Sequence, residues 1–302
     1  MHIKAEGLVK RINGIPFING LSLEARAGHI LGLVGPEGAG KTTVLQLLLN
    51  LIPCDEGQVT IDDKPLTGKV LDRMGFLPEK GGSYPVHSLN QTLIYFARLK
   101  NMPRKKASVE AVRLIDRFGM IDLMDIPVGH LPTEAREKLQ IMRAIIHNPE
   151  AILLDDPLKH LSLPSQNLVR KLVQRFKEEG KTIILATEKF DEAEQLCDEV
   201  VVLNEGQVVL RDKVKDIRAN FQENLILVEG ADNLQSLQSI HGVKKLVQEK
   251  QVARLYVDNR IPPQKILDVI IKTIKVTRLE VHRPRLSDIF LDVVNSRQKG
   301  GL

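Results

Sequence analysis

The chain has 302 residues, 43% of them apolar, and its 43 basic and 38 acidic side chains give a net charge of +5. This length and apolar share allow two folded domains with a core each, and they exclude an intrinsically disordered chain. The charge mildly favours an anionic partner but does not choose among nucleotide, lipid headgroup and nucleic acid. Since no apolar run approaches about eighteen residues, we expect a soluble chain without a signal peptide or a membrane span.

The cysteines and the basic clusters indicate the compartment of the protein and the partners it lacks. Cys54 and Cys197 are too few and too far apart for a disulfide framework or a zinc site, so we expect two packing residues in a reducing compartment. The basic run 104–106 is short and lies between helical stretches, so we interpret it as a solvated loop and expect no nucleic-acid partner.

The strongest pattern in the chain begins with the apolar run 30–34, which predicts a buried parallel strand. A leucine-rich stretch with helical spacing, 44–52, follows until Pro53 ends it. The segment between them fits the phosphate-loop pattern G-x-x-x-x-G-K-[ST] in the strand, loop and helix context that this motif requires. The loop consists of Gly35, Pro36, Glu37, Gly38, Ala39, Gly40, Lys41, Thr42 and Thr43.

The chemistry of this loop predicts ATP with Mg²⁺ as the cofactors. Its glycines allow a tight turn that points backbone N–H groups at a phosphate, and the following helix adds its positive N-terminal end. We expect Lys41 to reach the β and γ phosphates and the Thr42 hydroxyl to bind Mg²⁺.

A second buried strand is predicted at 151–155, where four apolar residues run into two carboxylates. This is the form of a Walker B strand, in which the first acid holds Mg²⁺ and the next residue polarises the attacking water. Asp155 takes the first position and Asp156 the second. An amphipathic helix precedes this strand, and a strand, a helix and a hairpin with its turn at 204–206 follow it.

The order of phosphate loop, "MGFLPE", helical segment, Walker B and "ATEKFDEAEQ" makes residues 1 to about 215 resemble the nucleotide-binding subunit of an ATP-binding cassette (ABC) transporter. The resemblance implies an α/β P-loop NTPase domain over 1–220, with a mixed sheet and a helical subdomain. Two such subunits, as a homo- or heterodimer, sandwich two ATP molecules between the Walker motifs of one chain and the signature of the other. An integral membrane permease docks near the Q-loop, which places the chain peripherally on the cytoplasmic face of the membrane.

Several residues depart from the family's nucleotide site. Ile12 stands where the resemblance places an adenine-stacking aromatic, and Phe17 is either a substitute or a core residue of a strand. Glu79 replaces the usual glutamine of the Q-loop, and its carboxylate remains a candidate Mg²⁺ ligand beside Thr42 and Asp155.

The signature L-S-G-G-Q aligns with Leu131, Pro132, Thr133, Glu134 and Ala135. In the family this helix start grips the partner's γ-phosphate, but Pro132 has no N–H and Glu134 brings a negative charge to an anion's place. We expect instead that Thr133 caps the helix and that Glu134 and Glu137 complement its dipole.

Two catalytic positions are also altered, Asp156 and Glu188. Asp156 stands where a catalytic glutamate is expected, about one methylene short of the water. Glu188 replaces the switch histidine and repels the γ-phosphate, although a surface pairing with Lys189 or Lys181 is an alternative. Because Ser162 also replaces the acid of the D-loop, we predict slow ATP hydrolysis or none by the chain alone. A homodimer would carry every defect twice.

The pattern changes after residue 220. Residues 221–302 read as β-α-β-β-α-β, a small ferredoxin-like α+β domain. One helical stripe is predicted to be core, with Ile266, Leu267, Ile270, Ile271 and Ile274. The closing "HRPRLSDIFLDVV" resembles the end of the accessory domain of drug- and antibiotic-export ABC subunits, which favours an exporter.

Three functions remain open. The first is the ATP-binding subunit of an ABC exporter. The second is a catalytically degenerate nucleotide-sensing regulator or immunity-type ABC protein, which the altered signature, Walker B and switch residues favour. The third, a soluble ABC protein of DNA repair or translation, lacks the long coiled coils or tandem cassettes that mark those classes.

Overall fold

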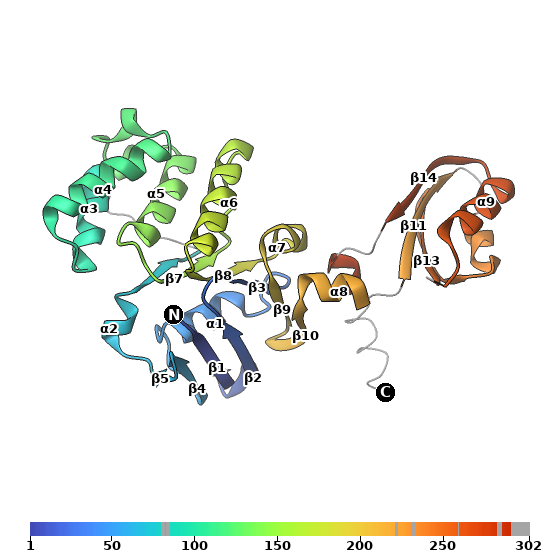
Figure 1. Ribbon diagram of the computed structural model, residues 1–302, viewed down its shortest axis with the longest axis horizontal. Coiled ribbons are helices and arrows are strands. Elements are labelled where there is room, and N and C mark those ends of the chain that lie inside the picture. Colours follow the sequence, from blue (N-terminus) through green and yellow to red (C-terminus); the bar gives the residue numbers. More distant parts are fainter. Residues whose placement is uncertain are drawn as a thin grey trace. The chain divides into compact units, whose positions relative to one another are not determined.

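The computed structural model describes residues 1–79, 82, 85–220, 223–230, 234–258, 260–282 and 286–290. The chain forms two compact units, Met1–Asp212 and Lys213–Leu302 (Figure 1). Within the described residues, no helix is both long enough and apolar enough to cross a membrane.

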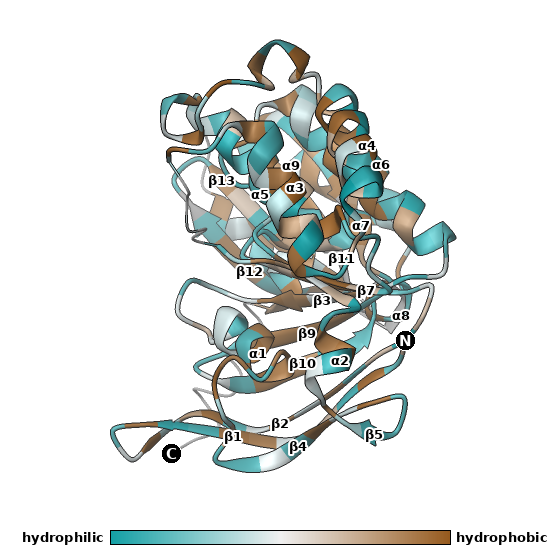
Figure 2. Cartoon of the chain, turned by 90° about the vertical axis from the view of Figure 1, so that its left-hand side faces the viewer, coloured by the Kyte–Doolittle hydropathy of each residue, from teal (hydrophilic) through white to brown (hydrophobic). Residues whose placement is uncertain are grey.

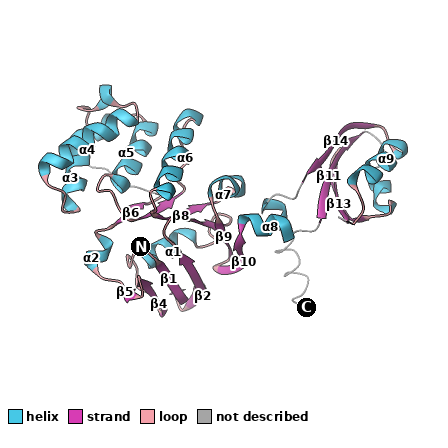
Figure 3. Ribbon diagram, in the orientation of Figure 1, coloured by secondary structure: helices cyan, strands magenta, loops and turns pink. Residues whose placement is uncertain are grey.

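The first unit contains two sheets (Figure 3). The smaller sheet is antiparallel, in the order β2-β1-β4-β5. Its strands are β1 (Ile3–Ile12), β2 (Ile15–Ala25), β4 (Glu56–Ile61) and β5 (Lys64–Pro65). The larger sheet has the order β10-β9-β3-β8-β7-β6, and the pairs from β9 to β6 are parallel. Its strands are β3 (Ile30–Val34), β6 (Met74–Leu77), β7 (Ala151–Asp155), β8 (Thr182–Thr187), β9 (Glu199–Asn204) and β10 (Gln207–Lys213).

Helices surround the larger sheet and form a helical subdomain in which α3 contacts α4 and α5 (Figure 1). The α-helices are α1 (Lys41–Leu48), α2 (Gly68–Leu71), α3 (Leu89–Leu99), α4 (Arg104–Arg117), α5 (Thr133–Ile145), α6 (Leu163–Glu178) and α7 (Phe190–Leu196), and the short 3₁₀ helices are η1 (Ile121–Leu123) and η2 (Val128–His130). A capping box at Ser88 and Gln91 starts α3. The basic run 104–106 is exposed, as expected, but it forms the first turn of α4 and not a loop.

The core of this unit explains its strand sequences. Strands β3, β7 and β8 are buried along their whole length, as parallel strands covered on both faces must be. Figure 2 shows how hydrophobic residues dominate β3 and β9. Gly75 in β6 faces α5 so closely that a Cβ there would lie 2.1 Å from the Ala144 carbonyl oxygen, so only glycine fits. Both cysteines are free thiols, and Cys197 is buried.

The second unit has its own antiparallel sheet, in the order β12-β13-β11-β14, which is the ferredoxin-like order expected from the sequence. Its elements are α8 (Val214–Asn220), β11 (Glu223–Gly230), η3 (Leu234–Ser239), β12 (Val243–Glu249), β13 (Val252–Asp258), α9 (Pro263–Thr273) and β14 (Val276–His282). The first predicted helix is the 3₁₀ helix η3. Ile266, Ile270 and Ile274 are buried and Leu267 packs against them, but the prediction for Ile271 was wrong because its side chain is 60% exposed. Part of the closing motif lies outside the described residues.

Candidate functional site

The phosphate loop connects the buried end of β3 to the start of α1, and two glycines shape it. Gly38 and Gly40 have φ of 77° and 99°, in the left-handed region that favours glycine. A Cβ at Gly40 would also lie 2.5 Å from the Ile18 side chain. The glycine spacing of the motif is therefore a requirement of this backbone and of its packing.

Lys41 bends back over this loop. Its side chain is buried, and its Nζ donates to the carbonyl oxygens of Gly35 and Pro36 at 2.9 Å and 2.8 Å. Neutral carbonyl oxygens are weaker acceptors for an ammonium than a phosphate is. The lysine is therefore held at the loop by contacts that a phosphate oxygen can replace.

Thr42 and Asp155 meet across the site. The Thr42 hydroxyl donates to Asp155 Oδ2 at 2.7 Å, which joins the start of α1 to the end of β7. Asp155 is only 2% exposed, and burial raises its pKa to about 6, with Asp156 and Glu79 adding to the effect. A hydroxyl and a buried carboxylate are hard oxygen donors of the kind that Mg²⁺ prefers when phosphates supply further ligands. The residues present therefore fit Mg-ATP.

Asp156 follows on a left-handed backbone with φ of 46°, and its N–H donates to the Ala186 carbonyl oxygen at 2.9 Å. Burial raises the pKa of Asp156, whereas Lys41 and Lys159 act in the opposite direction. Non-glycine residues in this region cost conformational energy and are concentrated at functional sites. The backbone thus fixes the carboxylate at the carboxyl end of β7.

Glu79 is paired within the chain. Its Oε1 lies 2.8 Å from Nζ of Lys159, in the turn that follows Asp156. The bond to Glu79 raises the pKa of Lys159, and Asp156 and Glu188 contribute in the same direction. Lys159 was not predicted from the sequence as a site residue, although a lysine three residues after Asp156 was a visible signal.

Glu188 is exposed, next to the buried Thr187. The pairing of Glu188 with Lys189 or Lys181 was wrong. Lys189 Nζ lies 3.1 Å from Glu192, and Lys181 donates to the Asn148 side chain and the Pro149 carbonyl oxygen at 2.7 Å each. Each lysine is held by other partners, and the charge of Glu188 instead raises the pKa values of Asp156 and Lys159.

The start of α5 is tied to the start of α6. Glu134 accepts hydrogen bonds from the hydroxyls of Ser162, at 2.7 Å, and Ser165, and Lys138 Nζ lies 3.5 Å away. The Ser165 and Ser162 hydrogen bonds lower the pKa of Glu134, so its charge persists at this helix start. The serine that replaces the D-loop acid thus binds the acid that replaces a signature glycine.

The expectation that Thr133 caps α5 was wrong. Thr133 is the first residue of the helix and Pro132 precedes it in the capping position, which has no side-chain hydrogen bond. The Thr133 hydroxyl accepts from Arg136 at 3.3 Å instead.

The expected base-binding region lies at the β1–β2 hairpin. Ile12 is 51% exposed and pairs with Ile15, which is also exposed. Phe17 is half-buried against the core of the unit. The structure therefore offers two exposed aliphatic side chains here, and Ile15 was missed because no motif marks it.

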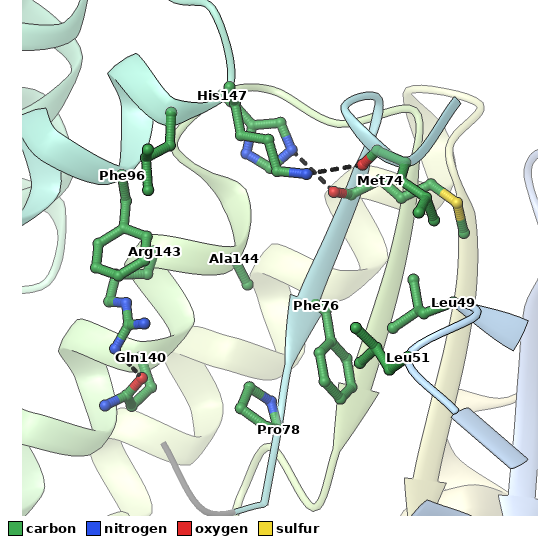
Figure 4. A pocket seen from close by; sticks show the side chains of 13 residues that line it. Leu49, Leu51, Met74, Phe76, Pro78, Phe96, Gln140, Arg143, Ala144 and His147 are labelled. Atoms are coloured by element: carbon green, nitrogen blue, oxygen red, sulfur yellow. Dashed lines mark hydrogen bonds between the residues drawn. The ribbon is translucent and has the colours of Figure 1, made fainter. Parts of the chain in front are cut away.

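A groove of about 340 Å³ lies between β6, α3 and α5 (Figure 4). Leu49, Leu51, Met74, Phe76 and Phe96 form much of its apolar lining. The Arg143 guanidinium lies 3.7 Å from the centre of the Phe96 ring, and the His147 Nε2 lies 3.1 Å from the Met74 carbonyl oxygen. Burial lowers the pKa of His147 to about 4, so its imidazole is neutral at pH 7. The groove combines an apolar floor with two cationic lining residues, Lys100 and Arg143.

Comparisons with known proteins agree with this architecture. A family model described as ABC transporter matches residues 18–159, and one described as ATP-binding protein DrrA1-3-like, C-terminal domain, matches residues 213–294. The chain is 31% identical to an uncharacterized ABC transporter ATP-binding protein of Alkalihalophilus pseudofirmus, over 87% of this chain and 99% of that one. It is 21% identical to the linearmycin resistance ATP-binding protein LnrL of Bacillus subtilis, over 96% and 97% of the two chains. A solved ATP-binding subunit of an ABC transporter shares the fold, with a TM-score of 0.69 at 21% identity, over 73% of this chain and 93% of that one.

Proposed function

Because the chain belongs to the family of ABC transporter ATP-binding proteins, we propose that it energises an exporter by coupling ATP binding, with at most slow hydrolysis, to a separate membrane permease. The resemblance of the closing segment to the accessory domain of drug- and antibiotic-export subunits supports export over import, and the second unit matches a DrrA-like C-terminal domain. The similarity to a linearmycin resistance protein along almost the whole chain supports it further.

The observation that carries ATP binding is the joint placement of Lys41, Thr42 and Asp155 around the phosphate loop. Lys41 and the N–H groups of the loop bind the phosphates, and Thr42 and Asp155 hold Mg²⁺, with Glu79 as a further candidate. Bound Mg²⁺ supplies positive charge that offsets the phosphates. Exposed Ile12, together with Ile15, provides apolar contact for the base.

Slow hydrolysis follows from two side chains. Asp156 is about one methylene shorter than the glutamate that would reach an attacking water, and its backbone holds it in place. Glu188 offers a carboxylate where a hydrogen-bond donor to the γ-phosphate is needed. ATP then acts chiefly by stabilising a closed dimer with a second cassette, identical or different.

The groove of Figure 4 is the proposed docking place of the permease. One of its walls is β6, which leads to Glu79, and another is α5, which begins at Thr133 within the signature segment. A segment docked there contacts both elements at once. The chain would then lie peripherally at the cytoplasmic face of the membrane.

A second candidate function is a nucleotide-sensing regulator or immunity-type protein without turnover. The hydrogen bonds from Ser162 and Ser165 to Glu134 favour it. They hold a negative charge at the signature helix start, where it would repel a phosphate.

The test is calorimetric titration of the full chain with Mg-ATP. We expect a dissociation constant from about micromolar to millimolar, because phosphate contacts supply much of the affinity. Lys41→Ala should abolish measurable binding, while Lys171→Ala, at an exposed position of α6, should leave it unchanged. Wild-type protein that ignores ATP, or binding indifferent to Lys41→Ala, contradicts the proposal.

A further inference from the structure

An excess of negative charge surrounds the place of the terminal phosphate. Four carboxylates of the described residues interact there, Glu79, Asp155, Asp156 and Glu188, against two lysines, Lys41 and Lys159. Glu79, Asp155, Asp156 and Lys159 line one small cavity. A terminal phosphate adds further negative charge to this group, which bound Mg²⁺ would offset only in part, so each ammonium near it gains in importance. Lys41 belongs to the phosphate loop, whereas Lys159 lies in the turn between the Walker B acids and Ser162.

The backbone around Lys159 is built to hold this side chain at the cavity. Its N–H donates to the Asp156 carbonyl oxygen at 3.1 Å, which closes a tight turn. Asp156 and His160, on either side, have φ of 46° and 59°, both in the left-handed region. Such strained turns occur where a side chain must be aimed. Lys159 Nζ ends 2.8 Å from Glu79 with 39% of the side chain exposed, so a ligand can still reach it.

We propose that Lys159 is a second phosphate-binding lysine, which supplies to the terminal phosphate the positive contact that Glu188 cannot give. The inference rests on the proposed function, because it requires ATP at the phosphate loop. Without nucleotide, Glu79 holds the ammonium at the cavity; with nucleotide, the more highly charged phosphate is the stronger acceptor. The ion pair thus keeps the lysine in place until ATP arrives.

A purely structural role for the pair makes a different prediction. If Lys159 only fastened the Q-loop to the turn after Walker B, its loss would affect ATP and ADP alike. A contact to the terminal phosphate acts on ATP alone, because ADP lacks that group. A comparison of the effects of the Lys159 substitution on ATP binding and on ADP binding therefore distinguishes a structural role from a contact to the terminal phosphate.

The experiment titrates the full chain with Mg-ATP and with Mg-ADP by calorimetry. We expect Lys159→Ala to weaken ATP binding about tenfold and ADP binding less than about twofold, as for the loss of one charge-assisted contact. Lys159→Arg should restore ATP binding to within about threefold, since it keeps the charge.

Controls distinguish this inference from the function it rests on. Lys171→Ala removes an exposed lysine of α6 and should change neither titration, and thermal unfolding without nucleotide should match for all variants. Equal effects of Lys159→Ala on ATP and ADP, or no effect on either, overturn the inference while ATP binding that depends on Lys41 stands. Absence of ATP binding in the wild type removes both.

Discussion

Asp156 combines a short side chain with a backbone that suits it. Aspartate tolerates the left-handed region better than glutamate, and φ here is 46°. A glutamate at this position would extend toward the attacking water at a cost of about 1 kcal/mol in stability. Compared with a glutamate, Asp156 therefore gives a more stable backbone but a side chain that extends less far toward the attacking water.

The prediction at this scale is a partial repair, Asp156→Glu with Glu188→His. A general base and a γ-phosphate donor contribute factors of about 10² to 10⁴ each in ordinary enzymes, and the two effects do not multiply cleanly. We expect phosphate release to rise at least about tenfold above the wild-type rate. The added Lys41→Ala change should remove the gain. Rapid wild-type turnover that depends on Lys41 would show that these two residues are not the limit.

At the scale of elements, His147 joins the end of α5 to β6 and provides a test by pH. Its pKa falls from 6.5 to about 4 on folding, because the neutral imidazole is buried beside Lys100. The unfolded chain therefore binds more protons between these values, and stability is lost as pH falls from 6.5 toward 4. We expect this loss to be smaller in His147→Gln, by about 1 to 2 kcal/mol at pH 5.

Chemical unfolding at pH 7 and pH 5 measures this difference. Asp155 contributes the opposite slope in the same window, because its pKa is raised to about 6. The comparison between wild type and His147→Gln, both without nucleotide, cancels that contribution. Identical pH dependence in the two proteins would contradict the buried, neutral histidine.

Much of the fold could be predicted because its signals are local. The strands 30–34 and 151–155 are continuous apolar runs, and the four strands of the second unit follow short alternating patterns. The errors arose where neighbours in space decided the outcome. Thr133 became the first helical residue because Pro132 took the capping position. The apolar stripe of α9 is wider than the face that the helix buries, so Ile271 at the edge of the stripe is exposed.

Within the site, the sequence supplied the residues of the phosphate loop and Walker B but not the pairs between motifs. The contact between Glu79 and Lys159 spans 80 positions, and that between Glu134 and Ser162 spans 28. A single sequence contains many acids and many donors at such separations, and only the three-dimensional path of the chain selects among them. The balance of acidic and basic side chains at the expected position of the terminal phosphate could therefore not be predicted from the sequence alone.

At the scale of the whole molecule, we expect the two units to have separate functions. The second unit has its own core, including Ile226, Val228 and Ile266, and every candidate nucleotide residue lies in the first. We predict that a chain ending at residue 220 keeps its Mg-ATP affinity within about twofold and that 221–302 folds alone. Calorimetry on the first fragment and circular dichroism on the second check this. A folded first fragment that no longer binds ATP would show that the second unit completes the site.

The close approach of Gly75 to Ala144 has a mechanical consequence. With no side chain between β6 and the backbone of α5, this contact contains no soft layer that could absorb a displacement. A push on α5 from a docked partner would therefore reach β6 directly, and β6 leads from Leu77 to Glu79. We therefore expect β6 and α5 to move together as a rigid pair, so that a displacement of α5 also displaces the nucleotide site.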